Sequence, residues 1–363
     1  MNPFDITRRR FALGAAAAVA GLQAPSVWAQ PAAKPYLADM HSHYGMFLPR
    51  LFGLDLARHM ADTGTTLLAW SATDDHRWIA LTPTGWQQTR QPGPGELWTS
   101  FQQRLAGYED KLKGWSLAKA LTAADVDAAL AGSPRVLLAT EGANFLEGQP
   151  DRVAQAHAWG VRHLQLIHFI QSPLGDRQTA EPVHGGLTPL GAKVVAECRR
   201  LGIVVDMAHG TSALVDGVLE ASDAIPVWSH SWISAQGGAW TDPSYIARSL
   251  SPATARKIAA RGGAVGLWTV RVNRDPAYPV HNATTYADEI VRMCELVGPN
   301  HVAFGTDMEG AGPGAILSNY VDLREVADKL MQRGLSEADL QNVFIGNYAR
   351  IVKSAMNGAA DKS

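Results

Sequence analysis

Short apolar runs alternate with amphipathic helical patterns along most of the chain. Eight runs rich in β-branched and other apolar residues predict strands, at 37–41, 65–70, 135–140, 162–168, 202–208, 225–229, 263–268 and 300–306. Between them, apolar positions recur with helical spacing at 54–61, 123–131, 188–201, 212–221, 252–261 and 285–297. Such alternation is typical of parallel βαβ units.

Eight parallel strands with intervening helices predict an α/β fold, a (β/α)8 TIM barrel. Two more helical patterns, at about 322–333 and 336–354, predict extra C-terminal helices that pack outside it. Thr122 and Ser251 mark two helix starts, because a hydroxyl can cap the free amides of a first turn. A doubly wound open sheet is the alternative, but no glycine-rich phosphate loop follows the first strand.

The stretch 71–99 has no hydrophobic periodicity and holds Trp78, Trp86 and Trp98 among prolines and glycines. We expect a long irregular loop here, and such loops in compact domains are often lids or substrate walls. The alternative is an aromatic-rich surface loop that packs on itself.

The N-terminal 29 residues resemble an export signal. The segment Thr7–Phe11 holds three consecutive arginines, an alanine-rich apolar run follows it, and small residues near Ala29 suit a signal peptidase. We expect residues 1–29 to be a cleaved Tat-type signal peptide, and residues 30–363 to be one periplasmic domain. The apolar run is shorter than the ~20 residues that cross a bilayer. An uncleaved N-terminal anchor is the alternative.

The composition argues against several classes of partner. The net charge is −2, and it becomes −4 when Asp5 and the three arginines are removed with the signal. Since no basic block remains, we expect neither nucleic acid nor a membrane surface as a partner. Cys198 and Cys294 lie in separate helical patterns, which favours two buried thiols over a disulfide. The oligomeric state is open, with a homodimer as one expectation.

Residues able to bind metal or move protons follow six of the eight predicted strands: His41 and His43, Glu141, His168, His209, His230 and Asp307. In a barrel, the loops at this end of the strands build the active site. Each histidine alone has an ordinary alternative as a solvated or hydrogen-bonded side chain. Together they predict one site at one face of the barrel.

The residue types suit a two-metal centre. Side chains two apart in a strand point to the same side, so His41 and His43 can reach one ion. Neutral imidazole suits Zn²⁺, and the two oxygens of a carboxylate can bridge two ions. Two such ions can lower the pKa of a shared water and polarise the carbonyl that it attacks. No serine nucleophile elbow, catalytic cysteine motif or Walker-type loop competes for this role.

The order of motifs resembles the membrane dipeptidase (renal dipeptidase) family of the amidohydrolase superfamily over most of the mature chain. The segments that carry the resemblance are DMHSHYG, TEGANF through VRHLQLIHFIQSPLGD, GIVVDMAHGT, PVWSHSWISA, SLSPATARKIAARGGAVGL, HVAFGTDMEG and LSEADLQNVFIGNYARIV. It implies a hydrolase that uses two divalent metal ions, expected to be Zn²⁺, to cleave a dipeptide or similar small amide.

The resemblance also implies a role for each matching residue. His41, His43 and Glu141 would hold one ion, and Glu141, His209 and His230 the other. Asp307 would take a proton from the attacking water and pass it to the leaving amine. His168 would stabilise the oxyanion and contact the substrate. Arg248 would bind a substrate carboxylate, since its planar fork matches one; the alternative for Arg248 is a surface cation beside a helix.

The sequence departs from the family pattern at His43, where the family usually has an aspartate. Other departures are Glu309 beside Met308, and a longer loop containing Trp232 between His230 and Arg248. Losing one negative charge should make the ions more electrophilic and could change which substrates react. Two further hypotheses therefore stay open: the same metal site acting on a lactone, ester or non-peptide amide, and a metal-bearing binding protein without catalysis.

Overall fold

The computed structural model describes residues 35–47, 55–73, 75–83, 85–239, 241, 244–270, 278–310, 315–317 and 319–360. Pro35–Ser363 form one compact unit. The expected signal peptide, residues 1–29, lies outside the described residues, as does Trp240 in the loop before Arg248. In the part of the chain that is described, no helix is both long enough and apolar enough to cross a bilayer.

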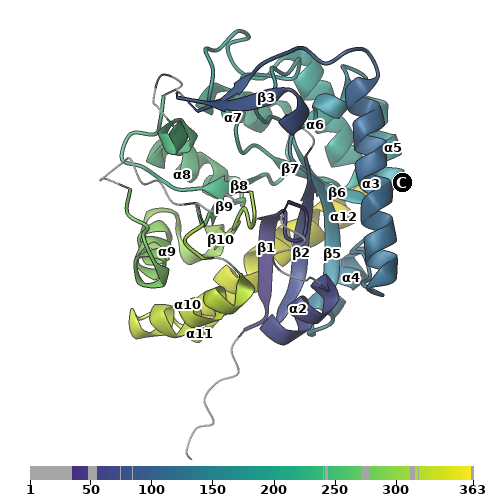
Figure 1. Ribbon diagram of the computed structural model, residues 1–363. Coiled ribbons are helices and arrows are strands. Elements are labelled where there is room, and N and C mark those ends of the chain that lie inside the picture. The colour runs from purple at the N-terminus through teal and green to yellow at the C-terminus, as the bar shows by residue number, and fades with distance from the viewer. Residues whose placement is uncertain are drawn as a thin grey trace, which may run out of the picture. The chain divides into compact units, whose positions relative to one another are not determined.

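Eight parallel strands form one sheet that curls into a barrel (Figure 1). Their order in the sheet is their order in the chain, so each strand pairs with its predecessor: β1 (Leu37–Ser42), β2 (Thr65–Ala72), β5 (Arg135–Thr140), β6 (Val161–Gln165), β7 (Val204–Asp206), β8 (Val227–Ser231), β9 (Ala264–Leu267) and β10 (Val302–Phe304). Each lies within or close to a predicted strand. The predicted (β/α)8 barrel is confirmed.

Two backbone hydrogen bonds join the last strand segment to the first at the carboxyl end of the barrel. The amide of Asp307 donates to the carbonyl of His41 at 3.0 Å, and the amide of His43 donates to the carbonyl of Met308 at 2.9 Å. Below them, the buried carboxylate of Asp39 on β1 accepts the backbone amide of Thr306 at 2.9 Å. The closure therefore fixes the segments that follow the first and last strands side by side.

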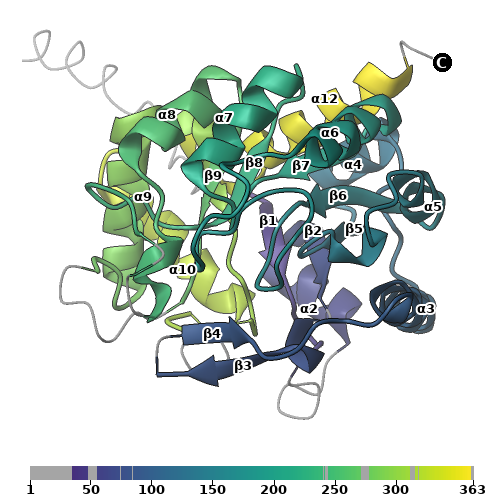
Figure 2. The ribbon, with the colours of Figure 1, turned by 90° about the horizontal axis from the view of Figure 1, so that it is seen from above.

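The helices surround the strands on the outside, as Figure 2 shows from above. They are α2 (Leu56–Thr63), α3 (Glu96–Gly114), α4 (Ala123–Leu130), α5 (Arg152–Ala158), α6 (Pro189–Leu201), α7 (Ser212–Ala221), α8 (Pro252–Ala260), α9 (Ala283–Val297), α10 (Tyr320–Gln332), α11 (Glu337–Gln341) and α12 (Asn347–Ala360). The predicted caps are present: the Thr122 hydroxyl accepts the amide of Asp125, and the Ser251 hydroxyl accepts that of Thr254.

Helix α12 covers the end of the barrel where the strands begin. Tyr348 and Val352 pack in one buried cluster with Ala38 of β1, Val227 of β8 and Ala264 of β9. The amino ends of the strands are thereby closed, which leaves the carboxyl ends for the site. The two cysteines are free, as expected; Cys198 is buried and Cys294 is half-buried.

The stretch 71–99 is more regular than its sequence indicates. A 3-10 turn, η1 (Asp75–Arg77), is followed by an antiparallel hairpin of β3 (Ile79–Thr82) and β4 (Gly85–Gln88), and α3 then begins at Glu96. The prediction of an irregular loop is therefore wrong for much of this stretch. Four-residue strands are too short to show a period of two against their surroundings.

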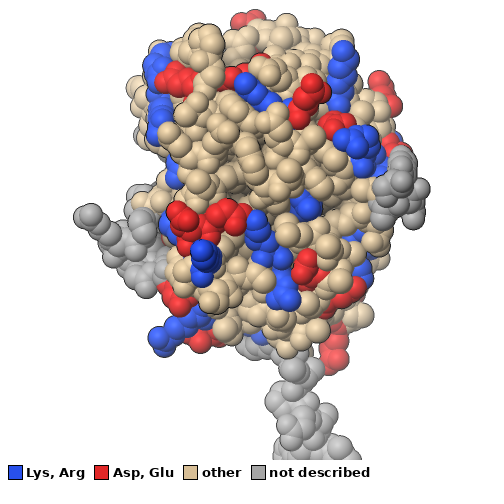
Figure 3. All heavy atoms as spheres, turned by 90° about the vertical axis from the view of Figure 1, so that its right-hand side faces the viewer, with Lys and Arg blue, Asp and Glu red and all other residues tan. Residues whose placement is uncertain are grey.

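Charged side chains of both signs are interspersed on the face seen in Figure 3. No single-sign block gathers over this face.

Candidate functional site

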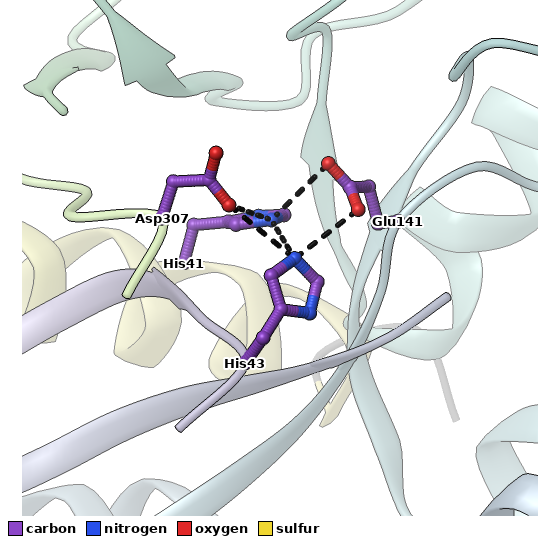
Figure 4. Close-up of side chains that lie close together, drawn as sticks. All are labelled: His41, His43, Glu141 and Asp307. Atoms are coloured by element: carbon purple, nitrogen blue, oxygen red, sulfur yellow. Dashed lines mark hydrogen bonds and ion pairs between the residues drawn. The ribbon is translucent and has the colours of Figure 1, made fainter. Parts of the chain in front are cut away.

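The seven residues expected at the carboxyl ends of the strands lie together in the structure. Six of them are buried, with 7% or less of each residue exposed, namely His41, His43, Glu141, His168, His209 and His230. Asp307, which follows β10, is half-buried. Figure 4 shows His41, His43, Glu141 and Asp307 pointing toward one another. The structure thus brings together residues from six strand ends in one cluster around Glu141.

Glu141 lies between two pairs of histidines. The Nε2 atoms of His41 and His43 are 3.1 Å apart, and so are those of His209 and His230. One carboxylate oxygen of Glu141 is 3.2 Å from His43 Nε2. Its other oxygen is 3.4 Å from His41, 3.3 Å from His209 and 3.5 Å from His230. Two histidine pairs that share one carboxylate match the donor set of a two-ion centre.

The spacing of these donor atoms fits metal ions. Nitrogens bound to one tetrahedral Zn²⁺ at ~2.0–2.1 Å lie about 3.3 Å apart. Within the described residues, two groups of donors close enough to hold an ion share Glu141: it joins His41, His43 and Asp307 in one, and His209 and His230 in the other.

Hydrogen bonds behind the rings set how the histidines face the site. His43 Nδ1 donates to the carbonyl of Ser71 on β2 at 3.0 Å, so a neutral His43 presents a lone pair at Nε2. His41 Nδ1 lies 3.2 Å from the Ser71 hydroxyl, and His230 Nδ1 lies 2.8 Å from the Ser229 hydroxyl. These contacts aim all three Nε2 atoms into the cluster, as ligand atoms must be.

The electrostatics suit cation binding. Burial lowers the pKa of His209 and His230 well below the usual histidine range, and the Arg248 guanidinium acts in the same direction. Burial alone would raise the pKa of Glu141, but the neighbouring histidines hold it well below its usual value. Burial also lowers the pKa of His43, yet the Glu141 carboxylate helps to raise it to about 10. Neutral histidines and an ionised carboxylate bind metal ions, and His43 would release its proton on binding.

Asp307 is the predicted base, and its carboxylate points into the cluster. Its Oδ1 is 3.4 Å from His43 Nε2 and 3.9 Å from His41 Nε2. Its φ of 54° lies in the left-handed region that L-residues rarely occupy. Residues held in such conformations often lie at active sites, where the surrounding structure supports the strain.

His168 reaches the same cluster and is held by an acid that the sequence analysis missed. Its Nε2 is 3.2 Å from Glu141 Oε1, and its Nδ1 donates to Asp75 Oδ2 at 2.9 Å. The same Asp75 oxygen accepts the amides of Phe169 and Ile170, each at 3.2 Å. Asp75 lies just after β2, at the carboxyl end of a strand where site residues are expected. The sequence could have indicated it had the stretch 71–99 not been interpreted as an irregular loop.

Arg248 is buried, with 1% of the residue exposed, at the end of η3 (Ser244–Arg248). Its guanidinium lies over the Trp268 ring, with 5.6 Å to the centroid, and donates to the carbonyl of His230 at 3.3 Å. It also donates to the side-chain oxygen of Gln178 at 3.1 Å, a residue that the sequence analysis missed. The alternative of a surface cation is wrong.

Glu309 has a structural explanation. Its two carboxylate oxygens accept the backbone amides of Gly45, at 2.7 Å, and Phe47, at 3.1 Å. Glu309 therefore fixes the segment after β1 against the segment after β10.

A cavity of about 480 Å³ opens over the cluster. Its lining combines polar site residues with an apolar wall and consists of His43, Phe47, Thr73, His76, Ile79, Leu81, Trp86, Glu141, His168, Phe169, His209, His230, Arg248, Trp268, Asp307, Glu309 and Gly310. This volume is in the range of small-molecule sites.

Comparison with known proteins places this geometry in context. Residues 101–363 match the family model described as membrane dipeptidase (peptidase family M19). Dipeptidase aclJ of Aspergillus oryzae is 30% identical over 223 residues, which cover 60% of this chain and 50% of that protein. Dipeptidase 3 of Macaca fascicularis is 28% identical over 229 residues, which cover 60% and 44%. The chain thus spans about half the length of these curated relatives.

A solved structure has the same fold. It is the metallo peptidase from Rhodobacter sphaeroides liganded with a phosphinate mimic of the dipeptide L-Ala-D-Ala, at a TM-score of 0.72 and 20% identity. The match covers 88% of this chain and 99% of that one.

Proposed function

The chain belongs to the membrane dipeptidase family, and from that premise we propose that it is a hydrolase that uses two divalent metal ions to cleave a dipeptide or similar small amide. The observation that carries the proposal is the position of Glu141 between two histidine pairs. We take the two ions to be Zn²⁺, because imidazole and carboxylate ligands suit it.

We assign each part of the reaction to a residue. His41, His43 and Glu141 would hold one ion, and Glu141, His209 and His230 the other. Two bound ions would lower the pKa of a shared water and polarise the amide carbonyl. Asp307 would accept a proton from the water as the water oxygen bonds to the carbonyl carbon, and would deliver that proton to the leaving nitrogen as the C–N bond breaks.

Two further residues would hold the substrate. Burial lowers the pKa of His168, but the carboxylates of Glu141 and Asp75 raise it to about 9, so both ring nitrogens carry protons near neutral pH. Its Nδ1–H donates to Asp75, and its Nε2–H can donate to the developing oxyanion. Arg248 lines the cavity and would hold the substrate carboxylate, with its guanidinium positioned by Gln178 and Trp268.

Metal analysis combined with a hydrolysis screen on the purified protein tests the proposal. We expect about two transition-metal ions per chain and turnover of some dipeptides. Asp307→Asn should retain the ions and lose turnover by about 10²-fold or more, the range of general base catalysis. A protein without bound transition metal, or full activity in Asp307→Asn, would refute it.

The departure at His43 supports a second candidate, the same metal site acting on a lactone, an ester or a non-peptide amide. Because barrel loops set specificity, the metal site alone does not choose among these substrates. A panel of dipeptides, lactones and aryl esters separates them. Turnover of lactones or esters without dipeptide turnover would favour this candidate.

We also propose that residues 1–29 direct export to the periplasm by the twin-arginine route, on the basis of the arginine motif and the apolar run that follows. Replacing Arg8 and Arg9 by lysine should leave the protein in the cytoplasmic fraction of an expressing cell. An unchanged periplasmic fraction would contradict the proposal. The proposed homodimer is tested by the mass of the purified protein in solution.

A further inference from the structure

The β3–β4 hairpin presents an apolar face to the cavity, and we infer that this face selects substrates with an apolar side chain. The inference rests on the proposed function and narrows it. It assigns the site to small amides that carry one carboxylate and one branched aliphatic or aromatic side chain.

Successive side chains in each strand of the hairpin point to opposite faces, and its apolar residues lie on one of them. Leu81 pairs with Trp86 across the two strands, and Ile79 precedes Leu81 by two positions. These three residues therefore share a face, and all three line the cavity. Ala80 and Gln87 form the adjacent pair, which points to the opposite face. The wall is thus one face of a regular element, and the other face supplies matched controls.

Two apolar side chains that line this cavity are exposed to water. Among the described residues, six large apolar side chains are exposed, and two of them, Leu81 at 67% and Phe47 at 41%, line this one cavity. Covering exposed apolar surface is favourable, roughly in proportion to the area removed from water. An apolar group on the substrate would provide that cover.

Contacts with the rest of the chain hold the wall in place. Trp78, at the base of the hairpin, is buried against Leu97 and Ile170, and its carbonyl accepts the amide of Thr89 at 2.7 Å. Gln88 Oε1 accepts the amide of Gln171, which follows β6, at 2.9 Å. A wall that is already ordered loses little entropy when the substrate binds.

The apolar surface continues from the hairpin to the metal cluster. The Trp86 ring lies 6.3 Å from that of Phe169, and the Phe169 ring lies 5.0 Å from that of His209, centroid to centroid. A side chain attached to the scissile amide can therefore reach the hairpin while the carbonyl lies at the cluster.

The charges of the cavity favour one carboxylate and disfavour a second charged group. Arg248 is the only lysine or arginine among the lining residues that the structure describes. Of the three lining acids, Glu141 and Asp307 lie within the histidine cluster and Glu309 accepts two backbone amides. A charged substrate side chain placed against Ile79, Leu81 and Trp86 would lose hydration without gaining a partner.

Binding of dipeptides to the metal-loaded Asp307→Asn protein tests the inference apart from turnover. Calorimetry would compare X-Ala and Ala-X dipeptides in which X is Gly, Leu, Phe, Asp or Lys. In at least one of the two series, we expect Leu and Phe to bind about tenfold or more tighter than Gly. Asp and Lys should bind no tighter than Gly.

Variants of the hairpin localise the effect. Leu81→Ser and Trp86→Ala, each added to Asp307→Asn, should reduce the ratio of Leu or Phe affinity to Gly affinity at least threefold, with little change for the Gly dipeptide. Gln87→Ala, on the opposite face, should leave the ratio unchanged. Leu81 is exposed near the turn, so Leu81→Ser remains informative even where Trp86→Ala disturbs the hairpin.

The outcomes separate the inference from the proposed function. Equal affinity for Gly, Leu and Phe dipeptides would overturn the inference. An equal loss of affinity for every dipeptide in Leu81→Ser would also overturn it. A preference for Leu and Phe that Leu81→Ser removes would support it even where the wild-type protein hydrolyses none of them. In that case only the proposed dipeptide hydrolysis would fail.

Discussion

Three residues of the candidate site have positive φ angles, which residues other than glycine rarely adopt. The φ angles are 68° at His209, 54° at Asp307 and 67° at Glu309. Such conformations cost roughly 1–3 kcal/mol each, so the surrounding structure has to hold them. At Asp307 this support includes its amide hydrogen bond to His41 and the close approach of Gly310.

Gly310→Ala should displace the Asp307 carboxylate. A Cβ at Gly310 would lie 2.0 Å from Asp307 Oδ1 and 2.9 Å from a ring carbon of His43, which forces one of them to move. A shift of about 1 Å at a catalytic group can cost around 10²-fold in rate, so we expect kcat to fall by that order. Gly107→Ala in α3 is the matched control, because its Cβ would meet no atom within 4 Å. Equal kcat values in the two variants would contradict the role of Asp307.

Gln178 connects the proposed carboxylate anchor, Arg248, to a proposed metal ligand, His209. Its side-chain oxygen accepts a hydrogen bond from Arg248, and its side-chain nitrogen donates to the carbonyl of Ser249 at 3.0 Å. Its backbone amide donates to the carbonyl of His209 at 2.7 Å. Hydrogen bonds to charged groups contribute about 1.5–3 kcal/mol. Gln178→Ala should therefore raise KM about tenfold for a dipeptide and change kcat little.

A dipeptide methyl ester provides the control for Gln178→Ala, because it has no carboxylate for Arg248 to hold. We expect its KM to be nearly the same in the wild-type protein and the variant. An equal rise in KM for the acid and the ester would instead indicate a general structural role for Gln178.

At the scale of elements, the segment between β6 and α6 is organised by one carboxylate. Asp176 accepts the amides of Val183 at 2.8 Å, His184 at 2.9 Å and Gly186 at 2.7 Å. Its own carbonyl accepts the amide of Thr211, the cap of α7. Burial raises the pKa of Asp176, but the three amides outweigh it and hold that pKa below the usual value. The ionised form therefore stabilises the segment that carries Gln178.

This linkage predicts how the stability of Asp176→Asn depends on pH. A carboxyl with a lowered folded pKa stabilises the protein above its unfolded pKa, about 3.9, and the contribution is lost as pH falls through the folded pKa. We expect Asp176→Asn to lower the free energy of unfolding by about 1–3 kcal/mol at pH 7. The difference from wild type should shrink below about pH 4.

Urea unfolding from pH 3 to pH 7 measures the Asp176→Asn effect, with Asp110→Asn on the exposed face of α3 as the control. A deficit in Asp176→Asn that stayed constant across this range would show that the loss does not come from the ionised carboxylate.

At the scale of the whole molecule, the sequence predicts the barrel well because its strands are continuous apolar runs. The positions of His41, Glu141, His209 and Asp307 at the carboxyl ends of strands also predict that they share one face, since parallel strands run in the same direction. The sequence does not reveal Gln178, whose role depends on contacts between segments far apart in the chain. Nor does it reveal the β3–β4 hairpin, whose strands are short, or the placement of α12 across the end of the barrel.

Metal removal should destabilise the whole barrel, because the proposed ligands follow or lie in four of its strands: β1, β5, β7 and β8. A ligand that binds only the folded state stabilises it by RT ln(1 + [L]/Kd), which is about 2.7–4.1 kcal/mol at 100 to 1,000 times Kd. Chelation of the wild-type protein should therefore lower Tm by several degrees. Glu141→Gln removes the shared carboxylate charge, so its Tm should respond much less to the chelator. An equal response in both proteins would place the stabilising ions elsewhere in the molecule.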